Sequence, residues 1–217
     1  YESPTGLLIF GVLFLGSSIA LSKYYTKLSI DTFSVSLYIT GLSLIAAGLL
    51  LLKVDENTTV LLLAFLAFCA LFITQDFLLS FISFLVISNS FLFLLLYNSY
   101  YEYIHVFITV HLLCMTLIFL KESKLIALSP KLSKLYGPIR IGLVISLLIS
   151  LIIIGKKDLL PFATNYMWFS FVAIWIVFIY LIYSILKIFK VHNITYQIGI
   201  YVISTCVLSS TIFAPSI

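Results

Sequence analysis

Long apolar runs fill this chain, and short polar segments separate them. A helix needs about 20 apolar residues to cross the hydrocarbon of a bilayer. Eight runs come close to that length: 6–22, 32–52, 58–74, 77–97, 104–120, 141–155, 166–186 and 194–213. The runs are continuous rather than alternating, which predicts helices and not barrel strands. We therefore expect an all-α polytopic integral membrane protein with about eight transmembrane helices. The pattern does not decide whether the short run 141–155 crosses the bilayer.

Composition supports a bilayer as the solvent. The 217 residues are 63% hydrophobic and 9% charged, with a mean hydropathy of +1.23. Soluble domains are about 25% charged, so a soluble fold of this size could not hide so much apolar surface. No internal repeat or flexible linker divides the chain, which predicts a single transmembrane domain over residues 1–217.

The runs 58–74 and 77–97 predict a tight helical hairpin. Only Gln75 and Asp76 separate the two runs, so the two helices are expected to lie antiparallel and touch. The polar residues of the second run should then lie against protein rather than lipid. These residues are Ser80, Ser83, Ser88, Asn89 and Ser90.

The cations between the runs are unevenly distributed. With eight spans, one side holds Lys23, Lys27, Lys121, Lys124, Lys131, Lys134, Arg140, Lys187 and Lys190, and the other holds Lys53, Lys156 and Lys157. Lys and Arg concentrate on the side that is not translocated. The side with nine cations is therefore expected to face the matrix or cytoplasm, with both termini in the opposite compartment. If 141–155 does not span, the ratio falls to seven against five.

Residues 121–140 form the longest segment between runs and are expected to be a basic loop. Their sequence is KESKLIALSPKLSKLYGPIR, with Pro130 and a break at Gly137-Pro138. One interpretation is an anchor that lies along the lipid headgroups. The other is a docking surface for a partner subunit. The net charge of +4 comes from cations between spans, and does not indicate binding of nucleic acid.

Two aspartates stand at the beginnings of predicted helices. Asp31 directly precedes the second run, where a carboxylate can accept backbone N–H bonds as an N-cap. Asp76 opens the fourth run and is expected to be a cap and turn residue. Its alternative role is an entry point for protons at the membrane surface.

Three further residues are candidates for proton relay. Glu102 and His105 are three residues apart and share a helix face, while His111 lies deeper and points roughly to the opposite side. Histidine titrates near neutral pH and can pass a proton. The alternative is an interfacial Glu/His pair and a buried His111 that is hydrogen-bonded to a neighbouring helix. Neither the histidines nor the three cysteines have the spacing of a metal site.

Several motifs are missing from the sequence. There is no Walker A motif, no GxGxxG, no lysine at a retinal-type position, no pair of mid-membrane histidines with haem-like spacing, and no GxxxG. We therefore expect no cofactor and no metal on this chain.

Four stretches within residues 31–120 follow a known order. They are DTFSVSLYITGLSLIAAGLLLL, ENTTVLLLAFLAFCALFIT, QDFLLSFISFLVISNSFLFLLLYN and YYEYIHVFITVHLLCMTLIFL. Together they resemble the antiporter-like membrane subunits of respiratory complex I, closest to NADH dehydrogenase subunit 2, in a divergent or split form. The family usually has a Glu inside the helix that corresponds to 77–97, where this chain has Ser88 and Asn89. The Lys that the family has beside the residue matching Glu102 is replaced by His105, one residue off register.

The resemblance implies a membrane-arm subunit of a respiratory NADH:ubiquinone oxidoreductase. Such a subunit contributes to proton translocation or to its scaffold, with neighbouring membrane subunits and lipids as partners and no nucleic acid. The implied location is the mitochondrial inner membrane, or alternatively a prokaryotic plasma membrane. Asp76, Glu102, His105 and His111 would carry the protons. An accessory structural subunit of a respiratory supercomplex and a small stand-alone transporter are the alternatives.

Overall fold

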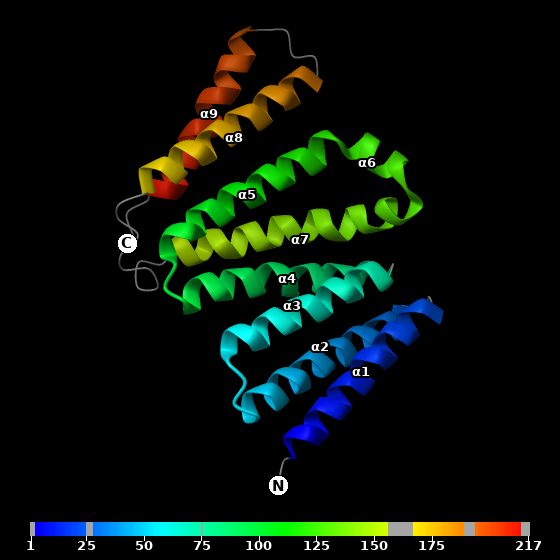
Figure 1. Ribbon diagram of the computed structural model, residues 1–217. Helices are drawn as coiled ribbons and strands as arrows, with labels where there is room; N and C mark the ends of the chain where they lie inside the picture. The colour runs from blue at the N-terminus through cyan, green and yellow to red at the C-terminus, as the bar shows by residue number, and fades with distance from the viewer. Residues whose placement is uncertain (1–2, 25–27, 75, 156–166, 189–193, 214–217) are drawn as a thin grey trace. The chain divides into compact units, whose positions relative to one another are not determined.

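The computed structural model describes residues 3–24, 28–74, 76–155, 167–188 and 194–213. Within these ranges the chain forms helices and no strands (Figure 1). The helices are α1 Pro4–Tyr24, α2 Leu28–Leu51, α3 Glu56–Ile73, α4 Phe77–Tyr97, α5 Tyr101–Leu120, α6 Glu122–Leu128, α7 Pro130–Gly155, α8 Met167–Ile188 and α9 Ile194–Phe213. Each of the eight predicted runs falls on a helix, and α6 is additional.

Six helices of the described chain are long and apolar enough to cross a membrane. They are α1 to α5 and α7, with candidate spans of 18 to 24 residues. At 1.5 Å per residue, such spans match the roughly 30 Å of bilayer hydrocarbon. The expected all-α polytopic membrane protein is therefore confirmed. In α8 and α9 the described apolar stretches are shorter, Trp175–Lys187 and Ile194–Ile203, so the seventh and eighth spans stay predictions.

Helix α7 corrects the predicted loop over residues 121–140. The helix begins at Pro130 and continues through Pro138, where the sequence predicted a break. Proline is well tolerated at the first position of a helix, because its missing N–H would be unpaired there anyway. Pro138 removes one hydrogen bond, but it lies buried beside Leu135 and Tyr136, so packing offsets this loss. The run 141–155 thus belongs to a helix that is long enough to span.

The described helices divide into two compact units. Unit 1 comprises residues 1–98 and 122–146, and unit 2 comprises residues 99–121 and 147–217. The expectation that residues 1–217 act as a single domain stays a prediction.

In unit 1, α1 and α2 form an antiparallel hairpin with closely approaching backbones (Figure 1). A Cβ atom on Gly41 would lie 2.9 Å from the carbonyl oxygen of Gly11 and 2.9 Å from the amide nitrogen of Leu15. Such distances are too short for any side chain. Glycine at both positions is therefore what allows the two helices to approach at this level.

The close contact between α1 and α2 repeats every seven residues. Seven residues are nearly two helical turns, so residues at this spacing stay on one face. Ser18 donates from Oγ to the carbonyl oxygen of Ser34 at 2.7 Å, and Ser34 donates back to the carbonyl oxygen of Ser18 at 2.8 Å. The small residues of this seam are Gly11 and Ser18 on α1, and Ser34, Gly41 and Gly48 on α2.

Helices α3 and α4 form the second hairpin of unit 1, antiparallel and in contact as predicted (Figure 1). Asp55 caps α3 by accepting a hydrogen bond from the Thr58 amide at 3.2 Å. At the same end, Asn57 and Asn98 exchange two side-chain hydrogen bonds of 3.1 and 2.8 Å. A reciprocal amide pair thus joins the start of α3 to the end of α4.

An apolar core joins these hairpins. Tyr38, Leu42, Ala70 and Leu79 are buried together, and partly buried side chains from α1 to α4 pack around them. Outward-facing residues such as Phe65 and Phe72 are more than half exposed. An apolar exterior around a small buried core is expected when lipid, rather than water, covers the outer surface.

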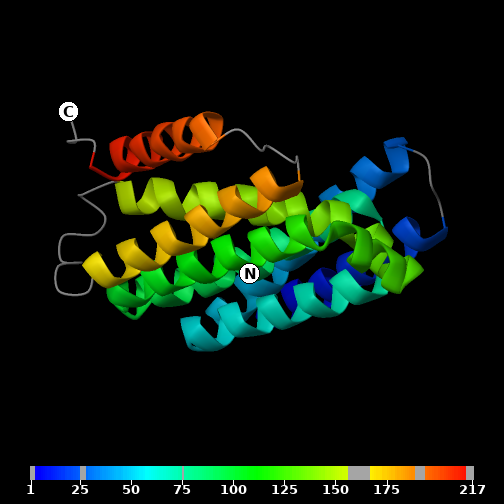
Figure 2. The same ribbon diagram turned by 90° about the horizontal axis from the view of Figure 1, so that it is seen from above.

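In unit 2, α5 contacts α8, and α8 contacts α9. Both views show α8 beside α5 and running in the same direction, while α9 returns antiparallel to α8 (Figures 1 and 2). The face of α5 that is buried carries Ile104, Ile108, Leu112 and Thr116. These residues recur every four positions, as expected for one helix face.

Candidate functional site

Asp76 is the N-cap of α4. Its Oδ2 accepts a hydrogen bond from the backbone N–H of Leu79 at 3.0 Å. This satisfies one of the amides that lack a partner within the first turn of a helix. The interpretation of Asp76 as a capping residue is confirmed, whereas its role in proton entry stays a prediction.

Asp31 is not the N-cap of α2, and that prediction was wrong. Helix α2 begins at Leu28, so Asp31 lies inside its first turn. A carboxylate at that position still complements the positive end of the helix dipole. Asp31 also lies close enough to Asp76 for the two carboxylates to repel each other, so the starts of α2 and α4 meet at one end of unit 1.

A polar contact joins α2 to α4 deeper in the unit. The Ser83 hydroxyl donates to the Tyr38 hydroxyl oxygen at 2.9 Å, and both side chains are completely buried. Tyr38 is seven residues after Asp31, and Ser83 is seven residues after Asp76. The two helices are therefore parallel, and this contact lies about 10 Å below the carboxylates.

Another face of α4 packs against α7. The hydroxyls of Ser88 and Ser146 are hydrogen-bonded across this contact. A Cβ atom on Gly142 would lie 2.6 Å from the Phe84 ring, and one on Gly137 would lie 3.2 Å from the Phe77 ring. Residue numbers increase together along both helices, so α4 and α7 are also parallel.

The polar residues of α4 thus lie against protein, as the sequence predicted. Ser80, Ser83, Ser88 and Ser90 are buried, and Asn89 is half-buried. Not every one of these hydroxyls has a hydrogen bond: Ser80 Oγ is buried and has no partner among the described residues. Helix α4 therefore carries polar groups into two helix contacts, one with α2 and one with α7.

His105 lies on the buried face of α5, with its side chain 8% exposed. In the part of the chain that the structure describes, its Nε2 has no hydrogen-bond partner. Its backbone carbonyl accepts a hydrogen bond from the Thr109 hydroxyl at 2.9 Å. A buried imidazole of this kind is a candidate for proton exchange, because a neutral ring can take up a proton to become imidazolium and then release one.

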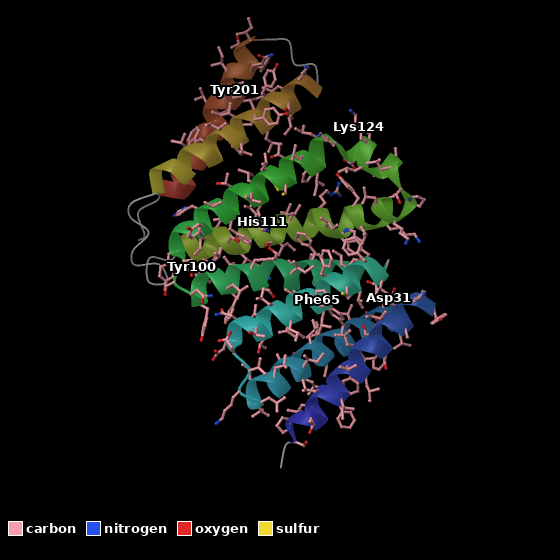
Figure 3. The ribbon with its side chains drawn as sticks, in the orientation of Figure 1. Asp31, Phe65, Tyr100, His111, Lys124 and Tyr201 are labelled. Carbon is pink, nitrogen blue, oxygen red and sulfur yellow. The ribbon has the colours of Figure 1, made fainter. Side chains whose placement is uncertain are left out.

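His111 is half-buried on the same helix (Figure 3). Its Nδ1 lies 3.0 Å from the carbonyl oxygen of Phe107. A carbonyl only accepts, so Nδ1 carries the hydrogen and Nε2 is left as the acceptor in the neutral ring. This bond lies within α5, and the expected hydrogen bond of His111 to a neighbouring helix stays a prediction.

The structure does not gather the four predicted relay residues into one described site. Asp76 belongs to unit 1, and the other three belong to unit 2. His105 and His111 are six residues apart, about 120° around the helix. The backbone of Glu102 is in α5, but its side chain lies outside the described residues, so the Glu102–His105 pair stays a prediction. Among the described residues, no three His, Cys, Asp and Glu side chains are grouped to hold a metal ion.

A comparison with protein families matches residues 1–217 to a domain of unknown function, DUF4401. The chain belongs to the DUF4401 family. The match covers all 217 residues, so the hairpins and the α4 contacts described above all lie within the family domain. Neither the curated proteins nor the solved structures give a match to this DUF4401 chain.

Two features of this DUF4401 chain were missed from the sequence. The first is the seam of small residues between α1 and α2. Its residues recur every seven positions, so a search for GxxxG, whose glycines are four positions apart, does not detect it. Comparing the two runs at a period of seven would have found Gly11 with Ser18, and Ser34 with Gly41. The second feature is the contact of Ser88 with Ser146, where a serine near the middle of each of two runs was the available signal.

Proposed function

We propose that this DUF4401 chain is a structural membrane subunit, a scaffold that holds neighbouring membrane proteins and lipids. One observation carries the proposal: hydroxyls of the spanning helices bind one another at helix contacts. Ser18 bonds Ser34, Ser83 bonds Tyr38 and Ser88 bonds Ser146. Hydroxyls used in this way stabilise the bundle, whereas a proton path also requires groups that titrate near neutral pH.

The resemblance of residues 31–120 supports a respiratory assembly as the setting. In that case the subunit lies in the inner mitochondrial membrane, or in a prokaryotic plasma membrane, beside other membrane-arm subunits. In unit 1, Lys23, Lys124 and Lys131 belong to the end where α2 and α4 begin, and Lys53 follows the end of α2. By the distribution of cations, the end with Lys131 faces the matrix or cytoplasm and both termini face the opposite side.

Extraction of native membranes in mild detergent tests this proposal. We expect the chain to migrate within a large complex that oxidises NADH and to stay bound when the complex is purified by a second method. A chain that migrates alone would reject the scaffold role, and a chain in a large complex without NADH oxidation would reject the respiratory setting.

A second candidate is a subunit that itself carries protons in an NADH:ubiquinone oxidoreductase. The buried Nε2 of His105, with no partner among the described residues, favours this candidate. The test is the double variant Glu102→Gln/His105→Ala, with protons translocated per NADH as the measurement. Cys114→Ala is a matched control, because Cys114 is on the same helix and exposed.

The two candidates predict different results. For a proton-carrying subunit, the double variant lowers the ratio of protons to NADH, and the control does not. For a scaffold, the ratio is unchanged while the complex remains assembled. If the complex fails to assemble with the double variant but assembles with the control, Glu102 and His105 contribute to packing.

A further inference from the structure

Helix α6 lies at the end of unit 1 and has no buried residue. It contains Leu125, Ile126 and Leu128, and the Leu128 side chain is 72% exposed. A helix of a soluble protein would pack such residues against a core. In a membrane protein, an uncovered apolar helix beside cations is typical of the interface between headgroups and acyl chains.

An ion pair holds α6 against the first part of α7. The guanidinium of Arg140 lies 3.8 Å from the carboxylate of Glu122, at the start of α6. The same guanidinium lies 5.3 Å from the centre of the Tyr136 ring. The charge of Arg140 thereby partly compensates that of Glu122, and the pair links the start of α6 to the third turn of α7.

The first two turns of α7 extend beyond the start of α4. Gly137 is level with Phe77, the first residue of α4, so residues 130–136 continue for about 10 Å past it. Exposure changes at the same level: Lys131, Leu132, Ser133 and Lys134 are exposed, and burial begins at Leu135. The two lysines on these exposed turns, Lys131 and Lys134, are therefore expected at headgroup depth.

The exposed side chains of this corner combine positive charge with apolar surface. Lys124 on α6 points away from α7 (Figure 3), and Lys131 and Lys134 are on the projecting turns of α7. Ile126, Leu128 and Leu132 are exposed among them. The carboxylates Asp31 and Asp76, at the starts of α2 and α4, belong to the same end of the unit, and Asp76 is used as a helix cap.

We propose that this corner, formed by Lys124, Lys131, Lys134, Ile126 and Leu128, is a binding site for anionic phospholipids. The ammonium groups bind the headgroup phosphates, and the apolar side chains enter the upper part of the acyl layer. The amphipathic make-up of the corner favours a lipid over a soluble anion, because free phosphate would leave the apolar residues in water. The site rests on one part of the proposed function, the holding of lipids, but lipid binding by the purified protein is tested separately from its membership of a respiratory complex.

Native mass spectrometry of the intact protein in detergent, titrated with phosphatidylglycerol or phosphatidylcholine, tests the site. A lysine near an anionic surface changes the binding constant about fivefold. The triple variant Lys124→Gln/Lys131→Gln/Lys134→Gln is therefore expected to bind phosphatidylglycerol on the order of a hundredfold more weakly. Lys53→Gln, at the opposite end of α2, is the control and should bind as tightly as the unmodified protein.

Two further variants separate charge from fold. Replacement of the same three lysines by Arg should retain binding. Leu128→Ser should weaken the binding of phosphatidylglycerol about tenfold, although the charge of the protein does not change. The proposal is overturned if the triple Gln variant binds phosphatidylglycerol normally, if phosphatidylcholine binds equally well, or if inorganic phosphate displaces the lipid at similar concentration. It is also overturned if the triple variant keeps the lipid and instead loses a bound protein, because the corner would then be a protein-docking surface.

Discussion

At the scale of single residues, glycine and serine determine how closely the helices of unit 1 approach. A Cβ at Gly41 would meet backbone atoms of α1 at 2.9 Å, whereas a Cβ at Gly16 would meet nothing within 4 Å. Both glycines are inside helices. The pair therefore separates the effect of close approach from the intrinsic effect of glycine on a helix.

We expect Gly41→Ala to lower the free energy of unfolding by about 1–3 kcal/mol, because the two backbones have to move apart. Gly16→Ala should leave it unchanged or raise it by up to about 1 kcal/mol, since alanine is the better helix former. Unfolding of both variants in detergent, followed by circular dichroism, measures the difference. Equal effects of the two substitutions would show that the hairpin tolerates a methyl group at its seam.

The bond between Ser83 and Tyr38 permits a double-mutant cycle. Removing either hydroxyl leaves the other one buried, and removing both leaves none. We expect a coupling energy of about 0.6 kcal/mol between Tyr38→Phe and Ser83→Ala, as is typical of hydrogen bonds between membrane helices. Tyr38→Phe combined with Ser18→Ala should be additive, because these residues belong to different bonds. Additivity in the first pair would mean that the bond contributes nothing to stability.

At the scale of the helices, Asp76 caps α4 and is also a candidate for proton entry. Asparagine can also cap a helix, and alanine cannot. We expect Asp76→Asn to unfold like the unmodified protein and Asp76→Ala to lose about 1 kcal/mol. If Asp76→Ala is as stable as Asp76→Asn, the cap is not important for the fold. A fall in proton translocation for a stable Asp76→Asn protein would assign the carboxylate a chemical role.

The sequence predicted helix locations better than helix ends. The apolar runs located all eight of the expected helices, because the hydrocarbon thickness fixes both the composition and the length of a span. Gly137 and Pro138 predicted a break before the sixth run, but α7 begins earlier and continues through both residues. The helix accommodates them where it packs against Phe77 and Phe84. The wrong N-cap at Asp31 has a related cause, because the three residues before it, Leu28 to Ile30, already belong to the helix.

The candidate site was less predictable than the fold. Capping by Asp76 follows from local sequence, and it was found. The contacts of Ser83 with Tyr38 and of Ser88 with Ser146 join residues 45 and 58 positions apart. Which serine meets which helix depends on how the helices pack, and one apolar run resembles another too closely to determine this from the sequence.

At the scale of the whole molecule, the helix directions of unit 1 predict the membrane sides of two lysines. Lys53 follows the end of α2, and Lys131 lies where α2 and α4 begin. In a variant without Cys69, Cys114 and Cys206, cysteines at positions 53 and 131 should react with a membrane-impermeant maleimide from opposite sides. Position 131 is expected to react from the matrix or cytoplasmic side. Labelling of both positions from one side would contradict the fold of unit 1.

The order in which these contacts can form has a consequence for biogenesis. Ser18 and Ser34 are 16 residues apart, so the first hairpin can close as soon as its second helix leaves the ribosome. Ser146 is made 58 residues after Ser88, a delay of about 3–12 s at ordinary rates of translation. During that interval, the α7-facing side of α4 is exposed to lipid or to the insertion machinery. Slow codons between residues 98 and 130 would therefore lengthen the period in which this side of α4 has no partner helix.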